Sequence, residues 1–174
     1  MLQKGDKKLI NAWAFYDWAN SVYPLVITTA VFPLYFGGVT GGENAQVFFL
    51  GTQWTNTVLY TYVLSFSFLI VAFLSPILSS IADYMGNKKR FLQFFLYLGS
   101  LSVMSLYFFE SKETLWIGIL FSILASIGFW GSIVFYNAFL LEVAYPQDHD
   151  RVSAKGFMFG YFGSVFLLLF ILTM

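Results

Sequence analysis

Two polar side chains, Asp17 and Asn20, lie inside the first long apolar stretch of the chain. An ionisable group is expensive at membrane depth, so a carboxylate there usually belongs to a solute or ion pathway. Together with Ser21, Pro24 and Thr28, these residues are spaced at i, i+3, i+4, i+7 and i+11, which predicts one polar face on a helix. A polar face on a membrane helix must meet other helices or a water-filled cavity.

This polar face has two interpretations. Either it lines a functional cavity, or it holds packed helices together through hydrogen bonds. The carboxylate of Asp17 favours the cavity, because amides and hydroxyls alone would be enough to link helices. In a cavity, Asp17 would bind a cation, a proton or the amino group of a zwitterion. Pro24 is predicted to loosen the helix midway, because proline has no N–H and leaves a carbonyl without its intrahelical donor.

Membrane helices are the elements that would position these residues. The 174 residues are 59% hydrophobic, 22% aromatic and 10% charged, with a mean hydropathy of +0.73. Segments long and apolar enough to cross a bilayer lie at about residues 10–35, 56–81, 91–109, 115–145 and 153–173. None of them alternates as a barrel strand does. The predicted fold class is an all-α integral membrane protein with five transmembrane helices.

Other kinds of site find little support in this composition. The net charge is zero, so nucleic acid is not an expected partner. The expected partner is the lipid bilayer. The chain has no cysteine and a single histidine, His149, so we expect no metal site and no cofactor. The Gly-rich residues 37–42 are followed by no basic residue or Ser/Thr that would hold a phosphate, and are interpreted as an outer turn.

The basic residues predict the orientation. Eight of the nine lie before the first segment, between the second and third, or between the fourth and fifth, and only Lys112 lies in a loop of the other side. Positively charged loops stay in the cytoplasm, so the N-terminus is expected there. The expected location is the bacterial inner membrane.

Two further features concern the later segments. Glu142 lies near the cytoplasmic end of the fourth segment, where it is either a solvated residue or a neighbour of Lys88 or Lys89. The last segment carries a face of small residues that lets another helix approach closely. These residues are Gly156, Gly160 and Gly163. We interpret the face as a helix-packing surface, through which an isolated chain would self-associate.

The loop between the second and third segments resembles the cytoplasmic loop motif of the major facilitator superfamily. The matching places are filled by Asp83, Gly86, Lys88 and Lys89. Two positions depart from the motif, with Ser79 where the first Gly is usual and Tyr84 where Arg is common. In the family, the carboxylate that matches Asp83 helps to latch two halves of the transporter on the cytoplasmic side.

The first segment resembles a particular branch of this superfamily, that of the autophagy-related vacuolar amino-acid effluxers and their bacterial relatives. The similarity lies in residues 16–23 and 32–36, and continues in residues 137–140 and 153–163. The family fold has twelve helices in two halves, each of two inverted three-helix repeats. Residues 1–174 would then form a partial N-terminal transmembrane domain, whose missing C-terminal half is supplied in cis or in trans.

The resemblance implies a secondary transporter that moves a small solute, with amino acids as the implied substrates, by alternating access. The site expected to line its pathway consists of Asp17, Asn20, Ser21 and Thr28. An alternative is a small accessory subunit without transport activity, packed on a partner through Gly156 and Gly160. An enzyme is not expected, because an intramembrane aspartyl protease needs a second aspartate in a Gly-x-Gly-Asp setting, and Asp83 follows Ile-Ala at the membrane edge.

Overall fold

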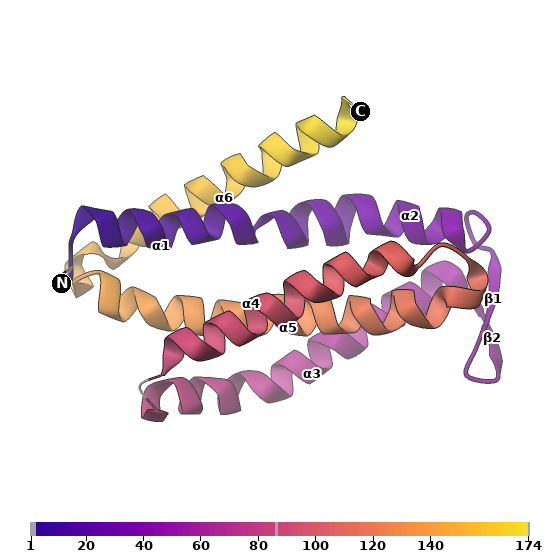
Figure 1. The fold of residues 1–174 in the computed structure, drawn as a ribbon, viewed down its shortest axis with the longest axis horizontal. Helices are drawn as coiled ribbons and strands as arrows, with labels where there is room; N and C mark the ends of the chain where they lie inside the picture. Colours follow the sequence, from indigo (N-terminus) through magenta and orange to yellow (C-terminus); the bar gives the residue numbers. More distant parts are fainter. Residues whose placement is uncertain (1–2, 86, 174) are drawn as a thin grey trace. The chain divides into compact units, whose positions relative to one another are not determined.

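The computed structural model describes residues 3–85 and 87–173, with the backbone alone for Ala82, Asp83 and Met85. Gly86 of the loop motif lies outside the described residues. In chain order the structure has α1 (Lys7–Asn20), a π-helix (Tyr23–Val31), α2 (Phe32–Val39), strands β1 (Gln46–Phe49) and β2 (Thr52–Thr55), α3 (Asn56–Met85), α4 (Lys88–Ser105), α5 (Leu115–Val143) and α6 (His149–Leu172) (Figure 1). Short 3-10 turns precede α5 and α6.

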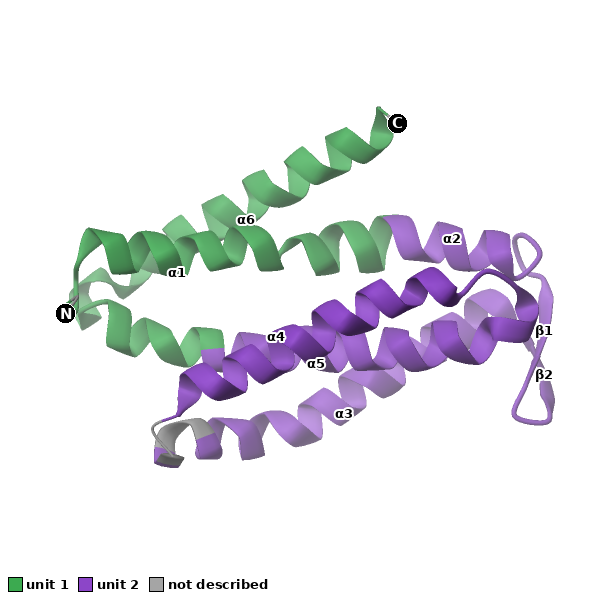
Figure 2. Cartoon of the chain, viewed as in Figure 1, with its two compact units in different colours: residues 1–30, 136–174 green, residues 31–135 purple. Residues whose placement is uncertain are grey.

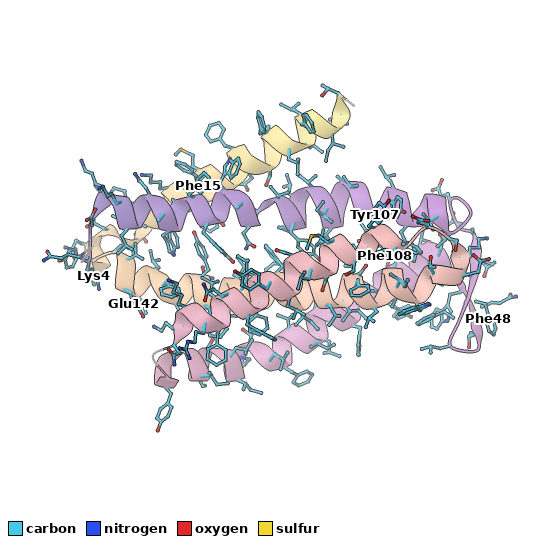
Figure 3. The ribbon with its side chains drawn as sticks, viewed as in Figure 1. Lys4, Phe15, Phe48, Tyr107, Phe108 and Glu142 are labelled. Atoms are coloured by element: carbon cyan, nitrogen blue, oxygen red, sulfur yellow. The ribbon has the colours of Figure 1, made fainter. Side chains whose placement is uncertain are left out.

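Five helical stretches of the described residues are long and apolar enough to cross a membrane. They are Lys7–Val39, Asn56–Ile81, Lys88–Phe108, Lys112–Val143 and Pro146–Leu172. The predicted all-α membrane fold with five spanning helices is thereby confirmed. Large apolar side chains such as Phe15, Tyr107 and Phe108 project outward from these helices (Figure 3). In a bilayer such side chains meet lipid, so their exposure carries no penalty.

The chain forms two compact units (Figure 2). The first consists of residues 1–30 and 136–174, and the second of residues 31–135. In the first unit, α1 packs against α6. The buried residues of α1 are Trp13, Ala14 and Asp17. Those of α6 are Val152, Gly156, Gly160, Gly163 and Ser164.

The first spanning helix changes its geometry at Pro24. α1 ends at Asn20, where the Ser21 N–H still donates to the Asp17 carbonyl at 2.9 Å, and the π-helix begins at Tyr23. Pro24 has no N–H, so the Asn20 carbonyl cannot receive the usual bond from four residues ahead. The chain continues as a π-helix, in which bonds span five residues. The Thr29 hydroxyl follows the same spacing and donates to the Pro24 carbonyl at 2.7 Å.

The second unit holds a β-hairpin that the sequence analysis did not predict. β1 pairs with β2 in antiparallel register, with Val47 opposite Trp54. The turn between them consists of Leu50 and Gly51, which have φ values of 50° and 80°. Two positive φ values are typical of the tight hairpin turn that usually carries Asn-Gly or Asp-Gly. Leucine rarely adopts this conformation, so the usual sequence signal is missing.

A buried amide joins the hairpin region to the start of α3. Asn56 is fully buried, and its Nδ2 donates to the Thr40 Oγ1 at 2.7 Å and to the Gly42 carbonyl at 2.8 Å. The Gly-rich residues 37–42 therefore include a turn held by α3. Deeper in this unit, Phe95 of α4 stacks on Phe135 of α5, with ring centroids 5.9 Å apart.

Candidate functional site

Asp17 lies in the contact between α1 and α6, and only 6% of its surface is exposed. The Ser21 hydroxyl donates to its Oδ1 at 3.2 Å. Its Oδ2 lies 3.2 Å from the position that a Cβ on Gly160 would occupy. Among the described residues, no lysine, arginine or histidine forms an ion pair with this carboxylate. A buried charge without a cation is costly, so the environment of Asp17 calls for a functional explanation.

The small-residue face of α6 makes the close approach to α1 possible. A Cβ on Gly160 would lie 2.5 Å from the Ser21 Oγ, and a Cβ on Gly156 would lie 2.8 Å from the Trp13 ring. A Cβ on Gly163 would meet the Trp18 side chain within 3.0 Å. In the structure α1 of the same chain covers this face, and the expected self-association of an isolated chain through Gly156 and Gly160 stays a prediction.

Tyr136, near the C-terminal end of α5, completes this buried region and was missed by the sequence analysis. Its ring stacks on Trp13 and Tyr16, with centroids 4.3 Å and 5.0 Å apart. The Trp13 Nε1 donates to the Tyr136 carbonyl at 3.1 Å. The Tyr136 hydroxyl points toward α6, 3.0 Å from the Cβ position of Gly156. A tyrosine inside an apolar run has no sequence signal that separates it from a core residue.

Two hydrogen-bond donors in this region have no partner among the described residues. They are the Tyr136 hydroxyl and the Asn20 Nδ2, and both atoms are buried. Tyr136 as a whole is 5% exposed. Most buried polar atoms in folded proteins are hydrogen-bonded, so two buried donors without a partner need a reason.

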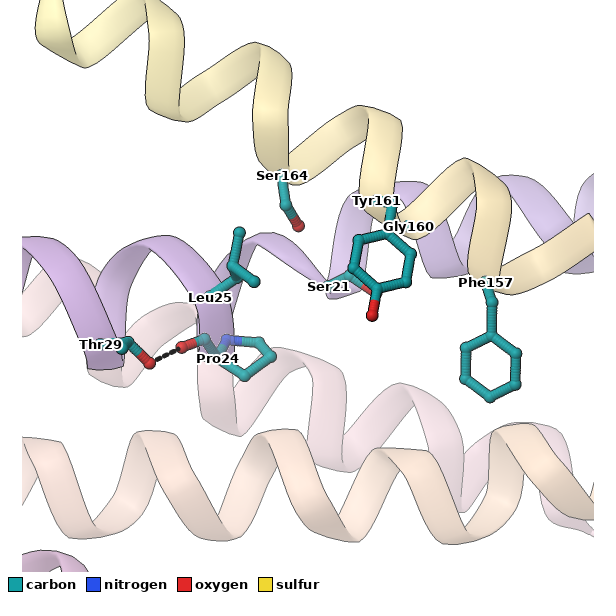
Figure 4. A pocket seen from close by; sticks show the side chains of 8 residues that line it. All are labelled: Ser21, Pro24, Leu25, Thr29, Phe157, Gly160, Tyr161 and Ser164. Atoms are coloured by element: carbon teal, nitrogen blue, oxygen red, sulfur yellow. Dashed lines mark hydrogen bonds between the residues drawn. The ribbon is translucent and has the colours of Figure 1, made fainter. Parts of the chain in front are cut away.

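A pocket of about 330 Å³ opens beside Ser21, which donates a hydrogen bond to the Asp17 carboxylate. Figure 4 shows the side chains that line the pocket. One wall is the start of the π-helix and the other is α6. The lining residues are Ser21, Pro24, Leu25, Thr29, Phe157, Gly160, Tyr161 and Ser164. Ser21 belongs both to this pocket and to the hydrogen bond with Asp17. The hydroxyl groups allow the pocket to hold a small polar group close to a negative charge.

The π-helix alters which predicted residues face this pocket. Ser21 and Pro24 line it, but Asn20 and Thr28 do not, and Thr29 does instead. The predicted polar face assumed α-helical spacing throughout. A π-helix has more residues in each turn, so the positions beyond Pro24 are rotated relative to that face.

The predicted loop residues are described only in part. Asp83 lies in α3, and its side chain, like Gly86, is outside the described residues. Lys88 starts α4 and is half-buried, and Lys89 is exposed. Glu142 is exposed near the end of α5 (Figure 3). The expected proximity of Glu142 to one of the two lysines stays a prediction, as does a gate built from these residues.

Comparison with known proteins places residues 5–147 in a family described as vacuole effluxer Atg22 like. An uncharacterized MFS-type transporter of Bacillus subtilis, YxiO, is 42% identical over 166 residues, which cover 94% of this chain and 36% of YxiO. Autophagy-related protein 22 of Neurospora crassa is 35% identical over 111 residues, covering 63% of this chain and 15% of that protein. No solved structure matches. The matched part of the chain therefore spans little more than a third of YxiO and about a seventh of the Neurospora protein.

Proposed function

Because the chain belongs to the Atg22-like vacuole effluxer family, we propose that it is the N-terminal part of a secondary transporter. The protein that contains it moves a small solute across the membrane by alternating access. This type of carrier holds its solute near the middle of the membrane between two repeats or halves. The rest of the pathway wall comes from the C-terminal half, in cis or in trans, and lipid surrounds the whole.

One observation carries this proposal: the Asp17 carboxylate is buried between α1 and α6 without a cationic partner in the described part of the chain. A charged side chain at the centre of a membrane helix costs about 2.5–3.5 kcal/mol on insertion scales. Packing of α6 against α1 does not need a charged side chain at this position, because the two helices already make contact through the glycines of α6. A pathway that handles positive charge does require a carboxylate.

Amino acids are the proposed substrates. The pocket beside Ser21 combines hydroxyl groups with apolar side chains, which suits a small molecule that has both a polar and an apolar end. Asp17 supplies negative charge for a proton, a cation or the ammonium group of the substrate. The description of the family supports an effluxer, and the coupling of that efflux to an ion is part of the proposal.

Counterflow in liposomes tests the proposal. The full-length protein is reconstituted, the liposomes are loaded in turn with each of the twenty common amino acids, and uptake of the same radiolabelled amino acid is followed. We expect saturable uptake of at least one of them and none in liposomes without protein. Absence of uptake for the whole panel would refute an amino-acid carrier and favour the accessory-subunit alternative.

The proposed orientation in a bacterial inner membrane is testable with two positions at opposite ends of α3 (Figure 1). Glu43 precedes the hairpin that leads into α3, and Asn87 follows α3. The chain has no cysteine, so Glu43→Cys and Asn87→Cys add single thiols to it. An impermeant thiol reagent is expected to label Glu43→Cys from outside and Asn87→Cys only from the cytoplasmic side. Labelling of Asn87→Cys from outside would reverse the orientation.

A further inference from the structure

Three lysines lie around Asn11 in the first two turns of α1 and α6. Lys7 and Lys8 precede Asn11 by four and three residues, so their side chains are its neighbours on the surface of α1. Lys155 comes from α6, and its Nζ donates a hydrogen bond to the Asn11 Oδ1. Two helices of the first compact unit therefore bring positive charge to one amide.

The positive charge around Asn11 is not balanced by carboxylates. Among the described residues, Lys7, Lys8 and Lys155 form no ion pair. The carboxylate of Asp6 is the N-cap of α1 and accepts a bond from the Lys8 backbone N–H at 2.8 Å. Because Asn11 is neutral, its hydrogen bond with Lys155 leaves the charge of the lysine in place. This surface therefore favours an anion.

On α1, an aromatic pair lies directly beyond Asn11. Phe15 follows Asn11 by about one helical turn and is 56% exposed (Figure 3). Its ring stacks on Trp18, with the centroids 5.1 Å apart. The Trp18 Nε1 lies 3.0 Å from the Cβ position of Gly163 in α6. Residues at i, i+4 and i+7 share one helix face, so this aromatic pair lies at the edge of the contact between α1 and α6, on the side of Asn11.

On α6, phenylalanines continue the same edge beyond Lys155. The Lys155 Nζ lies 5.9 Å from the centroid of the Phe159 ring, within the range of a cation–π contact. Phe162 and Phe166 follow Lys155 by seven and eleven residues on the same side of the helix, and are 68% and 70% exposed. Eleven residues of helix extend about 16 Å, which is close to half of the ~30 Å hydrocarbon core. The surface is therefore cationic at one end and aromatic over the depth of one leaflet.

We propose that this surface binds an anionic phospholipid of the leaflet in which α1 and α6 begin. The phosphate contacts Lys7, Lys8 and Lys155, and an acyl chain lies along the rings of Phe15 and Phe159. Basic pockets between membrane helices bind anionic lipid headgroups in this way. A dissolved anion would match the lysines but leave the aromatic surface uncovered, and a zwitterionic lipid would bring a further positive group to them. The site does not depend on the solute proposed above.

Native mass spectrometry of the full-length protein in a nonionic detergent tests this site. The protein is titrated with dioleoylphosphatidylglycerol, and the fraction that carries lipid gives a dissociation constant. We expect the zwitterionic dioleoylphosphatidylcholine to bind more weakly. A lysine near an anionic headgroup corresponds to about a fivefold change in affinity. The double variant Lys7→Gln/Lys155→Gln is therefore expected to bind phosphatidylglycerol about twenty-five-fold more weakly than the wild type.

Lys89→Gln is the matched control, because it removes the charge of an exposed lysine in the first turn of α4. Its dissociation constant is expected to equal that of the wild type. Glycerol phosphate has the phosphate but no acyl chain, and is expected to bind far more weakly than the lipid. Four results would overturn the proposal: equal binding of the two lipids, wild-type binding in a folded double variant, the same loss in Lys89→Gln, or equal binding of glycerol phosphate. Elution of each variant as a single peak shows that it is folded.

Discussion

Asp17→Asn in the full-length protein is expected to lower amino-acid counterflow by about ten- to a hundredfold. The amide keeps the shape of the side chain and its bond with Ser21 but cannot carry charge or exchange a proton. The variant loses the interaction of the charged carboxylate with the positive group that the pathway handles, and a hydrogen bond to a charged group contributes about 1.5–3 kcal/mol. Each 1.4 kcal/mol corresponds to a factor of about ten in rate. Initial rates in liposomes, normalised to the amount of inserted protein, measure the effect.

Asp150→Asn is the matched control for this variant. Asp150 is exposed in the first turn of α6, so the same chemical change there is expected to leave counterflow within about twofold of the wild type, as is usual for surface positions. Elution of both variants as single peaks in detergent would show that they are folded. Wild-type counterflow in a folded Asp17→Asn variant would assign Asp17 to helix packing, and the proposed pathway would lose its charged residue.

Gly160→Leu is expected to separate α1 from α6. The first side-chain atom alone would lie 2.5 Å from the Ser21 Oγ and 3.2 Å from the Asp17 Oδ2, and the first of these distances is shorter than a Cβ contact in a folded protein. Overpacking typically costs about 1–3 kcal/mol. The value here is expected at the upper end, because a displaced α6 also exposes Asp17. Thermal unfolding in detergent, followed by tryptophan fluorescence, should show a midpoint several degrees lower.

Gly38→Leu provides the comparison for that experiment. Gly38 is also a helical glycine, in α2, but a Cβ there would meet no atom within 4 Å. Its unfolding midpoint is expected to stay close to that of the wild type. If both variants lose the same amount of stability, the effect comes from adding leucine to a membrane helix rather than from the contact between α1 and α6.

The five spanning helices were predictable because each needs an apolar run of about 20 residues, and the chain contains five such runs. Asp17 was predictable as a candidate for the same reason, since a carboxylate stands out in an apolar run. The glycines of α6 indicated a packing face, but small residues do not identify the helix that covers them. The structure identifies α1 of the same chain as that helix.

The π-helix, the β-hairpin and the position of Tyr136 could not be predicted from the sequence. Pro24 indicated a perturbed helix, but not that the chain continues as a π-helix, which exchanges Thr28 for Thr29 in the pocket. The hairpin turn has leucine where asparagine or aspartate is usual. Tyr136 is stacked on Trp13 and Tyr16 by the packing of α5, and no local pattern in the sequence indicates a contact between residues so far apart.

Access of solute and water to Ser21, at the C-terminal end of α1, is most directly tested by thiol labelling. Ser21 lines the pocket and binds Asp17, and Ser21→Cys adds the only cysteine of this chain. The full-length protein, with any cysteines elsewhere replaced, is treated with an impermeant thiol reagent from each side of the membrane. Alternating access predicts labelling from both sides, slowed by a transported amino acid. If the reagent fails to label Ser21→Cys from one of the two sides, in a protein that still inserts and folds, the result would contradict a transport pathway along this helix.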